Sequence, residues 1–259
     1  MIDVIKHNSA AWDLEVEQAS DWTTPVSTEI IERARRGDWS VLLTPAKPVP
    51  REWFGDIAGR DLLCLASGGG QQAPVLAAAG ARVTSFDNSA KQLEQDRFVA
   101  ERDDLQLRLE QGNAADLSRF ADASFDLIFN PCSNLFMPAL GPVWDECFRV
   151  LRRGGVLLVG FTKPEVFIFD LLEADRTGEL VLRYSLPYAD ETSLTDSELR
   201  EKVGRGEPLE FSHTLEEQVG GQAAAGFHIV GLYEDYWHGP GRPIDRYMPA
   251  FVATRAIKP

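Results

Sequence analysis

The hydrophobic residues of this chain fall into short apolar runs and into longer stretches where apolar and polar residues mix as in helices. Between residues 60 and 163 the two kinds of segment alternate, beginning with the run that contains Leu62, Leu63 and Leu65. The short runs predict strands, and the stretches between them predict helices. We expect strands at 61–66, 82–86, 105–109, 125–130 and 155–161, and helices at 71–79, 89–102 and 141–151. This alternation predicts an α/β fold in which helices cover both faces of a parallel sheet.

The segments on either side of this region do not share its rhythm. Residues 1–58 hold four of the six tryptophans and have no strand pattern, so we expect helices there, at 8–20 and 27–37. Residues 164–212 are irregular and charged, and we interpret them as an insertion.

After the insertion the pattern predicts a helix at 214–225 and strands at 227–233 and 250–256. No helix joins the last two strands, so they must be antiparallel to each other. The expected organisation is a helical cap at 1–58, a core formed by 59–163 and 213–259, and the insertion at 164–212 before the last helix.

Composition and charge narrow the class of partner. The net charge of −14 disfavours a nucleic-acid backbone or an anionic membrane as partner. Cys64, Cys132 and Cys147 lack metal-ligand spacing and are expected to be reduced thiols, so no metal site is predicted. The apolar runs are far too short to span a membrane, and the N-terminus has no long apolar segment. We expect a soluble cytoplasmic protein.

A glycine-rich turn joins the first predicted strand to its helix. Gly68, Gly69 and Gly70 follow the strand, and the next strand ends at Asp87, 17 residues beyond Gly70. Glycine lets the backbone approach a ligand where a Cβ would collide, and an acid at this spacing is placed to accept hydrogen bonds from ribose hydroxyls. A nucleotide-like ligand is therefore predicted.

Several motifs together resemble the class I S-adenosylmethionine-dependent methyltransferases, over residues 60–163 and 213–257. They are the turn at 63–70, the acid Asp87, the Gly-Asn-Ala segment at 112–114, Ser-Phe-Asp-Leu-Ile-Phe at 124–129 and Arg-Val-Leu-Arg-Arg-Gly-Gly at 149–155. The resemblance implies a Rossmann-like, seven-stranded, mostly parallel sheet with an antiparallel last strand. It also implies S-adenosylmethionine as cofactor and a small-molecule methyl acceptor. The residues it assigns to cofactor binding are Ala66, Ser67, Gly68, Gly70, Asp87, Asn88, Asn113, Ala114 and Asn130.

Three residues depart from the family pattern. Cys64 replaces the usual acid of the first strand, so the hold on the cofactor's amino group must come from elsewhere. Ala66 replaces the first glycine, which predicts a turn with the negative φ of an ordinary L-residue. Asn113 replaces the usual aspartate, but its amide oxygen can still accept a hydrogen bond from the adenine amine.

Two other functions compete with methyl transfer. The spacing of Gly68, Gly70 and Ala73 also fits a dinucleotide fingerprint, which keeps an NAD-type oxidoreductase open. The neutral Gln71 and Gln72 at the start of the helix argue against a pyrophosphate there. The departures at Cys64 and Ala66 also keep open a second alternative, a module that binds S-adenosylmethionine without catalysing methyl transfer.

The acceptor is expected at the end of the fourth strand. Asn130 and Pro131 lie at the carboxyl edge, where such sheets bind ligands, and we interpret Asn130 as the residue that orients the acceptor. The aromatic residues of 1–58 and 164–212 predict that both segments cover the acceptor, whereas His213 is expected to be structural. The predicted activity is methyl transfer from S-adenosylmethionine to a small molecule by in-line displacement, which needs mainly alignment and exclusion of water.

Overall fold

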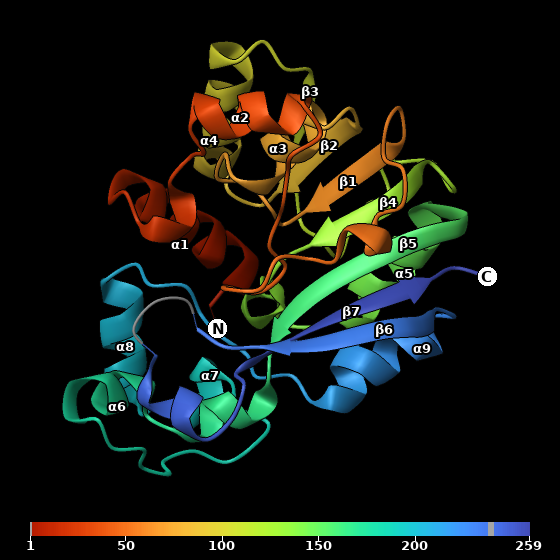
Figure 1. Ribbon diagram of the computed structural model, residues 1–259. Helices are drawn as coiled ribbons and strands as arrows, with labels where there is room; N and C mark the ends of the chain where they lie inside the picture. Colours follow the sequence, from red (N-terminus) through yellow and green to blue (C-terminus); the bar gives the residue numbers. More distant parts are fainter. Residues whose placement is uncertain (1, 238–240) are drawn as a thin grey trace.

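The computed structural model of the protein describes residues 2–237 and 241–259, and its centre is one seven-stranded sheet (Figure 1). The strand order is β3-β2-β1-β4-β5-β7-β6, with β7 antiparallel to both neighbours. The strands are β1 (Asp61–Leu65), β2 (Arg82–Asp87), β3 (Leu107–Gln111), β4 (Phe125–Asn130), β5 (Leu151–Thr162), β6 (His228–Asp235) and β7 (Phe251–Ile257). The mostly parallel sheet with an antiparallel last strand is confirmed.

Helices cover both faces of the sheet because successive strand residues point to opposite sides. Leu62 and Cys64 belong to one apolar core, and Leu63 and Leu65 belong to the other. The first core is closed by α2 (Thr28–Arg35), α3 (Gln72–Ala78) and α4 (Ala90–Arg102), and the second by α5 (Gly141–Val150). The two-faced arrangement predicted from the alternating pattern is therefore confirmed.

The N-terminal segment begins with α1 (Val4–Glu17), which is drawn in red beside α4 in Figure 1. The helix starts before the predicted residue 8 because the Asp3 side chain caps it by accepting from the Lys6 N–H at 3.1 Å. Asp13 then ties α1 to the start of α4 by accepting from the Ser89 hydroxyl at 2.6 Å and the Lys91 N–H at 3.0 Å. Trp39 packs edge-on against Phe54, so its indole contributes to the core.

The insertion and the short helical turns complete the described chain. The insertion contains α6 (Leu171–Thr177), α7 (Asp190–Ser193) and α8 (Asp196–Gly204). Short 3₁₀ turns lie at Asp21–Thr23, Arg51–Trp53, Asn134–Phe136, Pro164–Ile168 and Pro243–Arg246. None of the helices within residues 2–237 and 241–259 is long and apolar enough to cross a membrane.

Several predicted elements differ in their bounds from the structure; β5, for example, begins at Leu151 and not at 155. The helix expected at 214–225 is a π-helical turn, Glu216–Gly220, followed by α9 (Gly221–Ala224). This segment packs closely on α5, since a Cβ at Gly221 would lie 2.7 Å from the Trp144 ring. The strand expected at 105–109 begins at Leu107, because the Leu105 N–H is bonded to Ala100 at the end of α4.

Candidate functional site

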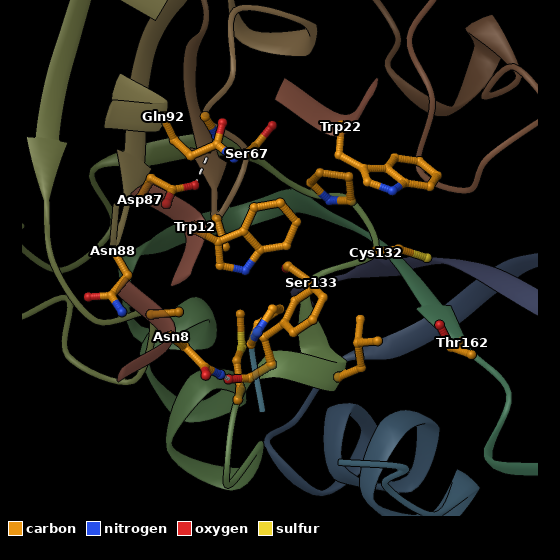
Figure 2. A pocket seen from close by; sticks show the side chains of 18 of the residues that line it. Asn8, Trp12, Trp22, Ser67, Asp87, Asn88, Gln92, Cys132, Ser133 and Thr162 are labelled. Atoms are coloured by element: carbon orange, nitrogen blue, oxygen red, sulfur yellow. Dashed lines mark hydrogen bonds between the residues drawn. The ribbon is translucent and has the colours of Figure 1, made fainter. Parts of the chain in front are cut away.

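A cavity of about 510 Å³ opens at the carboxyl edge of the sheet. Residues at or just after the ends of β1 to β5 line it, together with parts of the N-terminal segment and of the insertion. In Figure 2, Asp87, Asn88 and Gln92 lie on one side of the view, Cys132 and Thr162 on the other, and the indole of Trp12 stands between them. The cavity is therefore elongated, with a polar end at β2 and a second end at β4 and β5.

The glycine-rich turn forms one wall of this cavity, and its first residue corrects the sequence prediction. Ala66 has a φ of +47°, in the left-handed region, so the expectation of an ordinary φ there is wrong. The turn is held in place because the Ala66 N–H donates to Phe86 O at 2.7 Å, which ties β1 to β2 beyond Leu65. The tertiary bond offsets a conformation that costs an alanine about 1–2 kcal/mol.

Asp87 bridges two segments at the polar end of the cavity. Its Oδ2 accepts from the Gly68 N–H at 3.0 Å, and its Oδ1 accepts from the Ser89 N–H at 2.9 Å. Burial raises the pKa of the Asp87 carboxyl, and these backbone hydrogen bonds oppose the rise. The cap of α4 is Ser89, whose hydroxyl accepts from the Gln92 N–H. Asp87 therefore keeps acceptor positions that the fold does not use.

Two more cofactor-side candidates follow β3. Gly112 is required because a Cβ there would lie 2.5 Å from the Phe86 ring, which brings the 112–114 segment close to β2. Asn113 and Ala114 both line the cavity. The Asn113 side-chain oxygen accepts from the Ala115 N–H at 3.0 Å, and its second lone pair remains available.

A buried carboxylate on α4, which was not predicted from the sequence, holds the glycine-rich turn in place. Asp96, on α4, accepts from the Gly70 N–H at 2.8 Å and from the Ser85 hydroxyl at 2.5 Å. Burial raises its pKa to about 7, although both hydrogen bonds oppose the shift. The sequence does contain an indication of this role, because Asp96 lies on the apolar face of α4 between the buried Leu93 and Val99.

Ser67 and Gln92 have buried oxygen atoms without a partner at the cavity wall. Both side chains are almost fully buried, and neither Ser67 Oγ nor Gln92 Oε1 has a hydrogen-bond partner. Gly68 of the turn packs so closely on α4 that it has no room for a side chain, since a Cβ would lie 2.6 Å from the Gln92 Cβ. Unpaired buried polar atoms are costly, so this wall is suited to a polar ligand.

Asn130 does not have the free side chain that the sequence predicted. It is fully buried and is not among the residues that line the cavity. Its amide N–H groups donate to Leu65 O at 2.9 Å and to Ser133 Oγ at 2.8 Å, while its Oδ1 has no partner. Asn130 therefore fastens the end of β1 to the loop after β4, and Pro131, Cys132 and Ser133 of this loop line the cavity.

One face of α1 forms the roof of the cavity. Ile5, Asn8, Trp12 and Glu15 line it at spacings of three and four residues, as one helical face must. Trp12 also packs edge-on against Phe136. From the N-terminal segment, Trp22 and residues 42–45 line the cavity as well.

The insertion contributes much less to the cavity than its aromatic residues suggested. Only Pro208 and Glu210 of 164–212 are among the lining residues, and neither Tyr184 nor Tyr188 is. His213 also lies outside the lining, where it is buried with Nε2 2.7 Å from Met137 O. Closure of either segment over a ligand stays a prediction.

Comparison with known proteins adds a family to this geometry. Residues 63–159 match the family described as methyltransferase domain. The chain is 48% identical to a Bacillus subtilis protein named uncharacterized methyltransferase YbaJ, over 98% of each chain. It is 25% identical to the ubiquinone biosynthesis O-methyltransferase of Psychrobacter arcticus, over 77% of this chain and 74% of that one. A solved S-adenosylmethionine-dependent methyltransferase from Mesorhizobium loti has a similar fold, with a TM-score of 0.61 and 16% identity over 80% of this chain and 94% of that one.

Proposed function

Because this chain belongs to the class I S-adenosylmethionine-dependent methyltransferases, we propose that it transfers the methyl group of S-adenosylmethionine to a small molecule by in-line displacement. The observation that carries the proposal is the Asp87 carboxylate, which lies at the cavity wall with two backbone bonds made and acceptor positions left over. The Psychrobacter relative is named as an O-methyltransferase of ubiquinone biosynthesis, which supports a small acceptor.

The residues of the polar end fit the cofactor. Asp87 is assigned to the ribose hydroxyls, and Asn113 with the Ala114 N–H to the adenine. Asn88, Ala66 and Gly68 are assigned to the wall along the adenosine and methionine portions. Gly70 is not among the lining residues, because Pro25 and Val26 cover it. Ser67 Oγ and Gln92 Oε1, which have no partner within the protein, are placed to bond the polar groups of such a ligand.

Asp96 holds the glycine-rich turn in place from α4 and does not line the cavity. It bonds the Gly70 N–H from α4, and Cys64 on β1 is fully buried beneath the same turn. In this role Asp96 positions the turn and does not itself touch the cofactor.

The chemistry at the other end needs alignment more than acid–base groups. When bound, S-adenosylmethionine would supply an activated methyl group on a positively charged sulfur, and the residues of the cavity would align this group with the acceptor. Trp12 and Phe136 line the middle of the cavity and exclude water from it. Ser133, held by the Asn130 amide, is placed to hydrogen-bond the acceptor.

The arrangement around the turn disfavours a dinucleotide. The N-terminal segment covers it, since the Val26 N–H bonds Gly70 O and a Cβ at Gly70 would lie 2.9 Å from Pro25. The Gln71 amide is also used, because it donates to Asp21 O and Thr24 O. A pyrophosphate at the start of α3 would have to displace these contacts.

Calorimetry with the full-length protein tests the cofactor assignment. We expect S-adenosylhomocysteine to bind and NADH not to bind. The polar end offers acceptors for one nucleoside, and the described residues that line the turn include no cation to pair with a pyrophosphate. Binding of NADH with no response to S-adenosylhomocysteine would refute the proposal. A screen for transfer of labelled methyl groups to small hydroxyl and amine compounds then tests catalysis.

A further inference from the structure

The end of the cavity farthest from Asp87 has a composition of its own. Thr162 at the end of β5 pairs with Phe251 at the start of β7, and Cys132 follows β4 on the same edge of the sheet. Trp237 and Arg242 complete this part of the lining. We call these five residues the distal chamber. Apart from Arg242 it presents two aromatic rings, a thiol and a threonine, so most contacts of an occupant must be apolar or weakly polar.

Arg242 is the only lysine or arginine among the cavity-lining residues in the described part of the chain. Its guanidinium lies over the Trp237 ring, 4.1 Å from the centroid, and that ring packs edge-on against Phe251 at 4.5 Å. The stacking fixes the plane of the guanidinium and lowers the entropy that a ligand bond would cost. A cation is thus oriented at the wall of an apolar chamber.

The protein does not use up the hydrogen-bonding capacity of this cation. Within residues 2–237 and 241–259 its one ion pair is to Asp175 on α6, at 3.4 Å, and both side chains are more than one third exposed, so the pair contributes little. The side chain of the neighbouring acid, Asp245, accepts from the backbone N–H of Arg242 at 3.0 Å and from the backbone N–H of Trp237 at 3.4 Å. Asp245 therefore ties together the two backbone segments that carry the stacked pair, and among the described residues most of the five guanidinium N–H groups have no partner.

We propose that the methyl acceptor is a planar, mainly apolar compound with a carboxylate, and that Arg242 binds this carboxylate. This inference rests on the proposed function and adds the class of acceptor to it. A planar guanidinium matches a carboxylate with two parallel hydrogen bonds. Trp237 and Phe251 would contact the rest of the compound, and its methyl-accepting group would point toward Ser133.

The test compares acids with their amides as ligands of the full-length protein saturated with S-adenosylhomocysteine. The probes are 3,4-dihydroxybenzoate with 3,4-dihydroxybenzamide, and 1-hydroxy-2-naphthoate with its amide. Within each pair the shape is nearly the same and only the charge differs. We expect at least one acid to bind on the order of 10-fold more tightly than its amide, as a charge-assisted hydrogen bond predicts.

Arg242→Gln should abolish that preference, because it should weaken binding of the acid about 10-fold and leave binding of the amide unchanged. Arg246→Gln is the matched control, because Arg246 lies in the same short turn, is exposed and does not line the cavity. It should keep the preference.

Equal binding of acid and amide, no binding of any acid, or equal losses in both variants would each overturn the inference. Binding of S-adenosylhomocysteine is measured first on the same samples. Its absence in the unmodified protein would refute the proposed function, whereas its presence without acid preference would refute only the acceptor class.

Discussion

Replacement of Asp87 by alanine isolates the contact on which the cofactor assignment rests. A carboxylate offers about four acceptor positions, and the Gly68 and Ser89 N–H groups occupy two of them. The remaining positions are the ones assigned to the ribose hydroxyls. Loss of a hydrogen bond to a charged group costs about 1.5–3 kcal/mol, so the Kd for S-adenosylhomocysteine should rise about 10- to 150-fold.

The same substitution should also lower stability, and a control must separate the two effects. Without Asp87 the two backbone N–H groups lose their acceptor, which costs about 1–3 kcal/mol for each group that stays buried and unpaired. Asp13→Ala is the control, because Asp13 also accepts two hydrogen bonds at the start of α4 but does not line the cavity. Both variants should melt at lower temperature, and only Asp87→Ala should lose most of its affinity.

Isothermal calorimetry with S-adenosylhomocysteine measures the affinities, at a temperature well below both melting transitions. The buffer is mildly alkaline, because burial raises the pKa of the Asp87 carboxyl and a higher pH favours its ionised form. If Asp87→Ala binds as tightly as the unmodified protein, Asp87 is only a structural bridge between the turn and α4. If Asp13→Ala loses as much affinity as Asp87→Ala, the effect comes from the position of α4 and not from the ribose contact.

Three further substitutions test the structural residues of the site. Asp96 has a pKa of about 7 in the folded protein against 3.8 ordinarily, so the folded state retains a proton that the unfolded state loses. Stability should therefore fall as pH rises from about 4 to about 7, by on the order of a few kcal/mol, and Asp96→Asn should flatten this slope in denaturant titrations. Ala66→Gly should raise the melting temperature by about 2 °C, because glycine adopts the left-handed conformation without strain, whereas Ala78→Gly within α3 should lower it. Asn130→Ala should destabilise the protein by about 1–3 kcal/mol, since it leaves Leu65 O unpaired, and a loss of turnover with unchanged melting would contradict this structural role.

The strands and the positions of the turns that follow them could be predicted from the sequence because their causes are local. The apolar runs at Leu62–Leu65 and its neighbours can bury both faces only as central strands, and the glycines after them permit a tight turn. Asp87 could be placed for the same reason, since the end of β2 in a parallel sheet must lie beside the end of β1.

Side-chain roles at the cavity were decided by contacts between segments far apart in the chain. Ala66 adopts a left-handed conformation because a bond to Phe86 holds it there, and its local preference predicted otherwise. Asn130 looked free beside a proline, but the fold brings Leu65 and Ser133 to its amide and turns it inward. Arg242 lies more than 100 residues from Cys132, and only the packing of β7 against β5 brings both to one chamber. Local sequence therefore determined the sheet and the carboxyl edge where the cavity opens, while tertiary packing decided which polar groups remain available to hydrogen-bond a ligand.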